Sequence, residues 1–262
     1  MSNESKHPRH AMRRRQFLAA AGTAVASLGL GGCDENAAGS FFDSVLDGTE
    51  DLTRRVQRAI TPKNALAREY TEADITPDFK VNGTAEPRSS TYQAQAHNDF
   101  ADWRLDITGL VTRQASLSLA ELRAMPARTQ ITRHDCVEGW SQIGKWTGAR
   151  LGPLLDSVGV KAEARYAMFF CADTLDLSGD LYYESIDLDA AHHPQTILAY
   201  EMNGAPLSVG HGAPLRLRVE RQLGYKMAKY VMRIELVDSY RRFGKGRGGY
   251  WEDRGYEWYA GI

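Results

Sequence analysis

The sequence of 262 residues predicts an α+β fold in which mixed β-sheets are accompanied by a few short helices. Three observations favour this class. Apolar and polar residues alternate in several segments of strand length, the segments with helical spacing are short, and strands and helices do not alternate regularly along the chain. The last observation argues against a doubly wound parallel sheet.

Upstream of residue 76, the sequence predicts one helix within a polar segment. Apolar residues recur there at roughly helical spacing, and Pro62 follows the last of them; they are Phe42, Val45, Leu46, Leu52, Val56 and Ile60. We interpret residues 34–75 as a tether with an amphipathic helix that docks or lies near a membrane.

Residues 76–262 form the predicted globular domain. Its first strand, at 103–111, alternates Trp103, Leu105 and Ile107 and breaks at Gly109. Two short helices are predicted, one with a serine cap at 116–125 and one that ends at a glycine at 151–159. Further strands are predicted at 128–136, 165–173, 214–220 and 230–240.

The first 33 residues are typical of an export signal. An arginine-rich head precedes a mildly apolar run at 17–30, which is too short and too weakly apolar to be a membrane span. The pair Arg14-Arg15 followed by Gln-Phe-Leu resembles the bacterial twin-arginine signal, although Ala19 stands where that signal usually has a lysine. An ordinary secretory signal is the alternative.

The apolar run ends in Leu30-Gly31-Gly32-Cys33, which resembles the cleavage box of bacterial lipoproteins. Cys33 would then carry a diacylglyceryl group, and Asp34 resembles the signal that keeps such proteins at the inner membrane. The alternative is a chance cysteine near a small-residue cleavage site. In either case we expect the processed chain in the periplasm, anchored to the inner membrane where Cys33 carries lipid.

Composition excludes two classes of protein. Residues 1–33 contain five of the 32 basic and one of the 33 acidic side chains, so the processed chain carries 27 basic and 32 acidic groups, a net charge of −5. Such a chain does not bind nucleic acid by neutralising phosphates. Three cysteines are too few for a disulfide-stapled scaffold. Apart from Cys33 they are Cys136 and Cys171, so a disulfide between these two is the alternative to a metal-binding role for Cys136.

Several motifs for other chemistries are weak or missing. The glycine-rich stretch 244–249 leads into Tyr250-Trp251-Glu252 and lacks the Lys-Ser/Thr pair, so it is not a nucleotide-binding loop. His192 and His193 have no partner at zinc spacing, and no Cys-x-x-Cys or Gly-x-Ser-x-Gly motif occurs. Zinc, covalent haem and a serine nucleophile are therefore unsupported.

A cluster of cations lies beside two small-residue turns in the segment from residue 200 to 236. Its members are Arg216, Arg218, Arg221, Lys226 and Lys229. An extended anionic ligand needs charge-assisted hydrogen bonds of this kind and close approach of the backbone. A solvated basic face is the alternative interpretation.

Four blocks carry a resemblance to a known family. They are "RHDCVEGWSQIGKWTGARLGPLL", "AYEMNGAPLSVGHGAPLRL", "LGYKMAKYVMRIEL" and "YWEDRGYEWYAGI". In their order and spacing over about residues 77–262, they resemble the molybdopterin-binding domain of the sulfite oxidase superfamily, and especially its exported bacterial members. The resemblance implies a mixed-sheet fold and a molybdenum ion held by molybdopterin.

The resemblance also implies the site residues. Cys136 would be the thiolate ligand of molybdenum, a role that suits a soft sulfur donor. Trp140 and Trp146 would wall the site or serve as core aromatics. Tyr256 would donate a proton or hydrogen bond to an oxygen at the metal. The implied cofactor contacts are Asn82, Cys171, His211, Arg216, Met227, Ala228 and Lys229.

Departures from the family bear on the substrate. Val81 and Ser141 stand where sulfite oxidases have arginines that hold a dianionic substrate. The chain also ends at Ile262, which leaves no room for the family's C-terminal dimerisation domain, so we expect a single catalytic domain and a monomeric catalytic subunit. A neutral S-oxide or N-oxide therefore fits better than sulfite.

These inferences lead to one hypothesis and two alternatives. The hypothesis is an extracytoplasmic molybdoenzyme that transfers an oxygen atom with two electrons, reduces an S-oxide or N-oxide, and receives electrons from a membrane-bound b-type cytochrome. One alternative is oxidation of sulfite or another sulfur compound. The other is a non-catalytic lipoprotein binding module with a Cys136–Cys171 disulfide.

Overall fold

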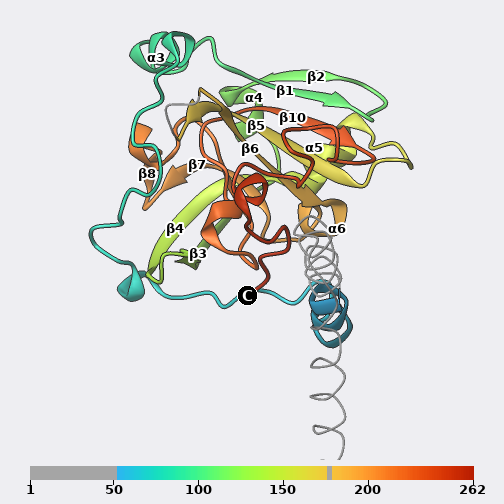
Figure 1. Cartoon of the computed structure of the whole chain (residues 1–262). Helices are drawn as coiled ribbons and strands as arrows, with labels where there is room; N and C mark the ends of the chain where they lie inside the picture. The colour runs from blue at the N-terminus through green and yellow to red at the C-terminus, as the bar shows by residue number, and fades with distance from the viewer. Residues whose placement is uncertain (1–51, 176–178) are drawn as a thin grey trace, which may run out of the picture. The chain divides into compact units, whose positions relative to one another are not determined.

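Ten strands in two sheets make up most of the fold within residues 52–175 and 179–262, which are the residues that the computed structural model describes (Figure 1). The predicted export signal and the predicted lipid-carrying Cys33 lie outside these residues. The described residues belong to one unit, Glu50–Ile262.

The first sheet is mixed. Its strand order is β2-β1-β10-β5-β6, and β1 pairs with β10 in parallel whereas the other neighbours are antiparallel. The strands are β1 (Arg104–Gly109), β2 (Ala115–Ser118), β5 (Tyr166–Thr174), β6 (Leu181–Asp187) and β10 (Val231–Val237).

The second sheet is antiparallel throughout. Its order is β3-β4-β7-β8, and β9 pairs with β7 beside this path. The long hairpin of β3 and β4 lies below β1, β2 and β10 in the view of Figure 1. The strands are β3 (Ala127–Asp135), β4 (Ser141–Arg150), β7 (Ile197–Met202), β8 (Ala205–Pro206) and β9 (Arg216–Arg218).

Helices are few and short in the described part of the chain. One spans residues 52–60, and the others are α3 (Ser90–His97), α4 (Leu119–Arg123), α5 (Leu151–Val158) and α6 (Leu188–Ala191). Four 3₁₀ turns complete the set: η1 (Glu72–Asp74), η2 (Val209–His211), η3 (Gly224–Lys226) and η4 (Glu252–Arg254). None of these helices has the length and hydropathy of a membrane span.

Two helix ends show how the sequence sets the boundaries. Ser118 caps α4, since its hydroxyl accepts from the amide of Glu121 while the Glu121 carboxylate accepts from the amide of Ser118. Gly159 ends α5 in the left-handed region at φ 72°, where a Cβ would also lie 2.9 Å from the hydroxyl of Thr112. The end of α5 lies where the sequence predicts it, whereas α4 is shorter than the helix predicted at 116–125, because residues up to Ser118 form strand β2.

One hydrophobic core joins the two sheets. Buried side chains of β1, β5 and β10 from the first sheet pack with those of β4, β7 and β9 from the second, and Leu151, Leu154, Leu155 and Val158 of α5 belong to the same cluster. A smaller cluster around Trp146 and Phe79 lies at the second sheet. The core therefore fixes the two sheets to each other, and with them the loops that each sheet carries.

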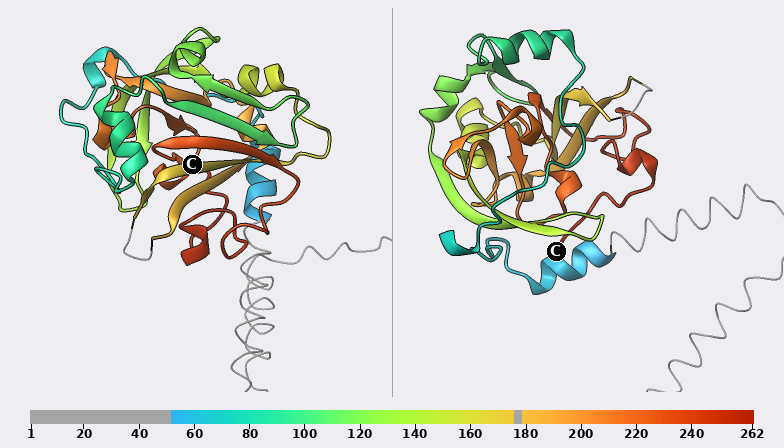
Figure 2. Two further views of the ribbon diagram at one scale, coloured as in Figure 1. Left: turned by 90° about the horizontal axis from the view of Figure 1, so that it is seen from above. Right: turned by 90° about the vertical axis from the view of Figure 1, so that its left-hand side faces the viewer.

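The structure confirms the predicted α+β class with mixed sheets and few short helices. The segment before residue 76 extends along the folded unit, because the Ala67 amide donates to Gln195, the Tyr70 amide to the Ile131 carbonyl and the Thr76 amide to the Ile143 carbonyl. Contacts with the two sheets thus begin upstream of residue 76. Figure 2 shows this segment and helix 52–60 from two further directions.

Candidate active site

Cys136 lies at the first position of the loop that joins β3 to β4. The Cys136 amide donates to the carbonyl of Trp140 at 2.9 Å, and the amide of Gly139 donates to the carbonyl of Cys136 at 3.0 Å. Gly139 closes this tight turn at φ 86°. The turn holds the half-buried thiol at the end of a long hairpin, and burial raises the pKa of the Cys136 thiol above its ordinary value.

A cleft of about 720 Å³, open to solvent, includes Cys136 in its wall. Segments that are far apart in the sequence line it: the loop around residue 83, the loop after β3, the end of β5, and the stretch from η3 to residue 229. Seven of the predicted site residues meet in this lining: Asn82, Cys136, Arg216, Met227, Ala228, Lys229 and Tyr256.

Two predicted cofactor contacts lie outside the lining of the cleft. His211 donates through Nε2 to the Phe79 carbonyl at 3.0 Å, and its Nδ1 forms a hydrogen bond with the Ser208 hydroxyl at 2.8 Å. Its carbonyl accepts from Arg216, so His211 contacts a cleft residue without lining the cleft. Cys171 is buried in β5, opposite Val231 of β10, and burial raises the pKa of its thiol far above the ordinary value.

Cys136 and Cys171 are both free thiols. The alternative of a non-catalytic binding module stapled by a Cys136–Cys171 disulfide is therefore wrong in its structural premise. The reason is position: Cys171 points into the core between the sheets, whereas Cys136 lies on a hairpin loop at the cleft.

Neither predicted tryptophan lines the cleft. Trp146 is fully buried in the smaller core cluster, and its ring lies 5.1 Å from the Arg216 guanidinium and 4.3 Å from that of Arg218. Trp140 lies on the loop after Cys136, where its indole donates to Glu138 and packs against the ring of His134. Trp146 thus holds the guanidinium of Arg216, which lines the cleft, through a cation–π contact on the core side.

The predicted cation cluster divides into paired and cleft-facing members. Arg218 forms a buried ion pair with Glu220 at 2.6 Å. Lys226 donates to both Glu184 and Glu252, and all three side chains are fully buried. Arg221 donates to the carbonyls of Pro62 and Lys63, away from the cleft. Only Arg216 and Lys229, among these five cations, line the cleft.

Neither Arg216 nor Lys229 forms a salt bridge with a carboxylate among the described residues, although Asp173 lies near enough to Lys229 to attract it. Arg216 is 1% exposed, its Nε has no hydrogen-bond partner in the described part of the chain, and burial together with Arg218 lowers its pKa to about 9. Lys229 donates to the carbonyls of Asn82, Thr84 and Gly210, while burial and the charge of Arg216 lower its pKa to about 7. Two buried cations that form no salt bridge fit an anionic ligand, so the cleft suits the phosphate of molybdopterin.

The cleft also contains residues that the sequence did not single out. Asp173 follows Cys171 by two positions in β5, is nearly buried, and has its pKa raised to about 6 because burial outweighs the attraction of Lys229. Glu138, Tyr225 and Trp251 line the wall near Cys136 and Tyr256. Asp173 ends the buried apolar run of β5, which could have identified it as an inward polar residue, whereas the other three lie in loops or short 3₁₀ turns without a fixed pattern.

Aromatic rings form one wall of the cleft. Tyr256 stacks on Trp251 with ring centres 5.1 Å apart and meets the edge of Tyr225 at 5.2 Å. Tyr256 is 36% exposed, so its hydroxyl is accessible to a molecule in the cleft. The wall is therefore apolar with a hydroxyl donor at its surface.

The positions where sulfite oxidases have arginines carry no charge. Val81 is 38% exposed and packs beside Gly210, and the Ser141 hydroxyl donates to Asp135 at the start of β4. The nearest exposed cation in this stretch, Lys80, forms an ion pair with Glu138 at 3.7 Å. A dianion in this part of the cleft would meet a paired lysine and a carboxylate.

The rejected motifs stay outside the site. In the glycine-rich stretch 244–249, the amides of Lys245 and Arg247 donate to the Asp253 carboxylate, so an internal anion occupies this turn. His192 pairs with Asp156 on the surface. Within residues 52–175 and 179–262, no group of three or more His, Cys, Asp and Glu side chains is placed to hold a metal ion.

This chain belongs to the oxidoreductase molybdopterin-binding domain family, whose model matches residues 92–243. The resemblance to the sulfite oxidase superfamily is thereby confirmed. The protein is a molybdopterin-dependent oxidoreductase, and the residues that line the cleft fit such a cofactor.

Two relatives are similar over different lengths. A protein of Azospira oryzae, provisionally named the protein-methionine-sulfoxide reductase subunit YedZ1, is 39% identical over 222 residues, which cover 84% of this chain and 77% of that protein. The protein-methionine-sulfoxide reductase catalytic subunit MsrP of Xanthomonas campestris is 37% identical over 149 residues, 53% of this chain and 46% of MsrP. The chain thus matches about half the length of MsrP.

A solved structure shares the fold. The crystal structure of the sulfane dehydrogenase SoxCD from Paracoccus pantotrophus superposes with a TM-score of 0.52 at 24% identity, over 68% of this chain and 46% of that chain. At this identity the similarity shows the fold alone.

Proposed function

We propose that the protein reduces S-oxides as the catalytic subunit of a molybdoenzyme. The observation that carries this proposal is the composition of the cleft around Cys136. The lining beside Cys136 includes Val137, Glu138, Tyr225, Trp251 and Tyr256. The arginines of sulfite oxidases are replaced by Val81 and Ser141, and the neighbouring Lys80 is paired with Glu138. A neutral S-oxide can accept a hydrogen bond there, whereas a dianion is disfavoured. The names of the two relatives support the same substrate class.

Each residue has a role in this proposal. The Cys136 thiolate would bind molybdenum, and Arg216 and Lys229 would hold the phosphate of molybdopterin, assisted by Asn82 and by the backbone at Met227 and Ala228. His211 and Cys171 lie outside the lining. His211 would support Arg216 through the hydrogen bond from its guanidinium, and Cys171 would support β5 by packing in the core. When bound, the cofactor supplies the two-electron redox chemistry, and the protein supplies orientation and protons.

Tyr256 has the accessible hydroxyl that this reaction needs. Reduction of an S-oxide consumes two electrons and two protons and gives a sulfide and water. The Tyr256 hydroxyl can donate a hydrogen bond to the departing oxygen, and the stacked Trp251 ring fixes its orientation. The apolar wall would hold the substituents of the sulfur.

The electron partner and the location belong to the same proposal. Both relatives are named as subunits, which supports a partner protein for this chain. We infer that electrons come from a membrane-bound b-type cytochrome, that the processed chain lies in the periplasm as a monomeric catalytic subunit, and that a lipid on Cys33 anchors it to the inner membrane.

Steady-state assays in both directions test the substrate. The purified holoprotein is given a reduced dye with methionine sulfoxide and other S- and N-oxides, and separately an oxidised acceptor with sulfite. We expect turnover with S-oxides and little with sulfite. Efficient sulfite oxidation at low substrate concentration would favour the alternative and contradict the inference drawn from Val81 and Ser141.

Replacement of Tyr256 tests its role. A phenylalanine ring can stack on Trp251 as the tyrosine ring does, and the side chain is exposed, so Tyr256→Phe should keep cofactor content and stability. Its kcat should fall by roughly ten- to a hundredfold, because the hydroxyl donor is lost. Tyr259→Phe is a control, since this tyrosine lies outside the cleft lining. An unchanged kcat in Tyr256→Phe would remove Tyr256 from the mechanism.

A further inference from the structure

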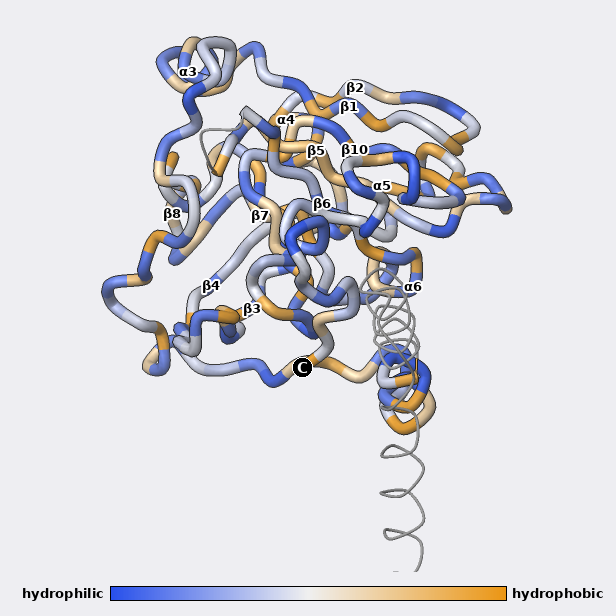
Figure 3. Tube along the Cα trace, in the orientation of Figure 1, coloured by the Kyte–Doolittle hydropathy of each residue, from blue (hydrophilic) through white to orange (hydrophobic). Residues whose placement is uncertain are grey.

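Helix 52–60 presents its apolar residues to solvent. Leu52, Val56 and Ile60 follow one another at four-residue spacing and are 61%, 50% and 75% exposed. Figure 3 shows hydrophobic and hydrophilic residues around the turns of this helix. An amphipathic helix of a globular protein normally turns such a stripe toward the core. Here the orientation is reversed.

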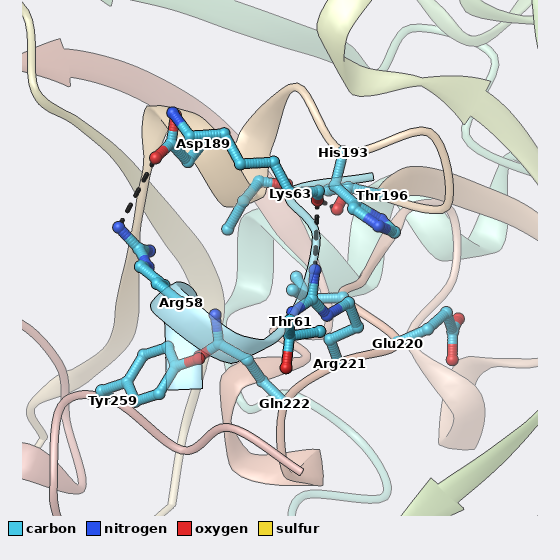
Figure 4. Close-up of a pocket in the computed structure, with 12 residues that line it drawn as sticks. Arg58, Thr61, Lys63, Asp189, His193, Thr196, Glu220, Arg221, Gln222 and Tyr259 are labelled. Atoms are coloured by element: carbon cyan, nitrogen blue, oxygen red, sulfur yellow. Dashed lines mark hydrogen bonds and ion pairs between the residues drawn. The ribbon is translucent and has the colours of Figure 1, made fainter. Parts of the chain in front are cut away.

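The polar side of the helix faces the folded unit. Arg54 lies over the ring of Trp258 at 5.7 Å, and Arg58 lies over the ring of Tyr259 at the same distance. Arg58 also forms ion pairs with Asp187 and Asp189. Figure 4 shows Arg58 beside Asp189, joined to it by the ion pair, in the lining of a pocket of about 590 Å³.

These contacts fix which way the helix faces. Lys63, just after the helix, also pairs with Asp189, and Arg221 donates to the Lys63 carbonyl. Rotating the helix to bury its stripe would break the partly buried Arg58–Asp187 pair and move both arginines off their aromatic rings. The exposed stripe is therefore a stable feature of the unit, and it needs a covering surface.

The sequence around the helix indicates what covers it. Residues 52–68 contain five cations, Arg54, Arg55, Arg58, Lys63 and Arg68, and no acid. Eighteen residues separate Leu52 from Cys33, so a lipid on Cys33 would keep the helix within about 65 Å of a bilayer even if that segment were fully extended. Residues 34–51 contain six acids and no cation, so we assign most of the binding to the apolar stripe and less to charge.

We propose that helix 52–60 lies flat in the headgroup region of a bilayer, with its apolar stripe inserted and its polar side against the folded unit. This is the geometry of an interfacial amphipathic helix. A chain tethered at Cys33 alone could turn freely, whereas the helix would fix one face of the oxidoreductase unit toward the membrane. The proposal does not depend on the substrate or on the cofactor.

Binding to lipid vesicles tests this proposal. Because the described fold begins at residue 52 and every buried core residue follows it, a chain that begins at Asp34 keeps the whole fold but lacks both the leader and Cys33. Its co-sedimentation is measured with vesicles of phosphatidylglycerol and phosphatidylethanolamine, and with vesicles of phosphatidylcholine. We expect binding to both, several-fold stronger to the anionic vesicles.

Matched variants isolate the stripe. The double change Val56→Asn and Ile60→Asn should lower vesicle binding roughly tenfold or more on both kinds of vesicle, because both side chains would lose their apolar contact. Arg55→Gln, on the exposed side of the helix, should lower binding to anionic vesicles only, by roughly fivefold. Leu181→Asn removes a side chain that is 57% exposed outside the helix and should change nothing. All four positions are exposed, so each variant should melt as the parent does.

Two results would overturn the proposal. One is vesicle binding that is absent, or that is the same in the double variant as in the parent. The other is a self-association or partner-binding equilibrium, seen by analytical ultracentrifugation without lipid, that the double variant abolishes while lipid binding stays negligible. The stripe would then be a protein interface.

Discussion

The cations between residues 216 and 229 form two regions that look alike in sequence and differ in structure. Arg218 and Lys226 are buried with carboxylates, from Glu220 in one case and from Glu184 and Glu252 in the other. Arg216 and Lys229 are nearly as buried, yet their hydrogen bonds go to carbonyl oxygens and neither forms a salt bridge with a carboxylate. The first region completes the fold, and the second is prepared for an anion that the chain does not supply.

The difference has opposite consequences for stability. Removing a cation that neutralises buried carboxylates should weaken the fold, whereas removing an uncompensated cation should not. The paired region also holds the cleft residues in place. The ion pair of Lys226 with Glu252 connects η3 to η4. Tyr225 within η3 and Trp251 at the start of η4 line the cleft. The paired region thus positions the walls of the region that binds.

The largest expected effect is that of Lys226→Met. It leaves Glu184 and Glu252 buried together, although burial and their mutual repulsion already raise the pKa of Glu184. The free energy of unfolding should fall by roughly 3–5 kcal/mol, measured by urea denaturation of cofactor-free protein. Lys145→Met, which removes a surface pair with Glu72, serves as the control and should cost less than about 1 kcal/mol. Equal losses in both variants would abolish the distinction.

The second effect concerns pH. Burial and the charge of Arg216 lower the pKa of Lys229 to about 7 in the folded protein, from 10.5 in the unfolded chain. Between these values the unfolded state binds more protons, so this residue makes the free energy of unfolding rise with pH from about 7 to about 10.5, by at most about 5 kcal/mol. The gain is absent below pH 7, where both states are protonated.

A comparison of variants isolates this slope in cofactor-free protein. The free energy of unfolding of the parent should rise relative to that of Lys229→Met across that range of pH, since only the parent has the titrating amine. Parallel pH profiles for the two proteins would show that Lys229 keeps an ordinary pKa. Bound cofactor should reduce the slope, because a phosphate stabilises the charged amine.

Arg216→Met should have the smallest effect on stability, and unlike Lys226→Met it should not destabilise the protein. Its guanidinium has no carboxylate partner, so cofactor-free protein should be unchanged or more stable by about 1 kcal/mol. Molybdopterin content after purification should fall at least several-fold, because one of the two cations proposed to bind its phosphate is gone. A large loss of stability with unchanged cofactor content would reverse the assignment of the two regions.

The sequence predicts the strands and helices better than it predicts which side chains contact one another. The strands around Ile107, Ile131, Phe169 and Ile234 were predicted because their residues alternate or form continuous apolar runs, and α4 and α5 because Ser118 and Gly159 mark their ends. Strands β2, β4, β6, β7 and β8 were not predicted. Residues 116–118 of β2 were assigned to the helix at 116–125, and the other four strands are short or interrupted by polar residues and glycines.

The site residues were likewise predicted individually, but most of their contacts were not. Cys136, Arg216, Lys229 and Tyr256 were found through the resemblance, and the structure brings them to one cleft. The pairing of Lys226 with Glu184 and Glu252 joins residues 42 and 26 positions apart, which no local pattern reveals. Helix 52–60 shows the same limit, because its periodicity predicts a stripe but not that the stripe faces outward.

X-ray absorption at the molybdenum edge tests the central claim most directly. It counts the sulfur atoms bound to the metal in parent holoprotein and in Cys136→Ser, with Cys171→Ser as the matched control. We predict one sulfur neighbour fewer in Cys136→Ser, together with loss of S-oxide reduction, and an unchanged sulfur count in Cys171→Ser. The same number of sulfur neighbours and full activity in Cys136→Ser would contradict the assignment of Cys136 as the metal ligand.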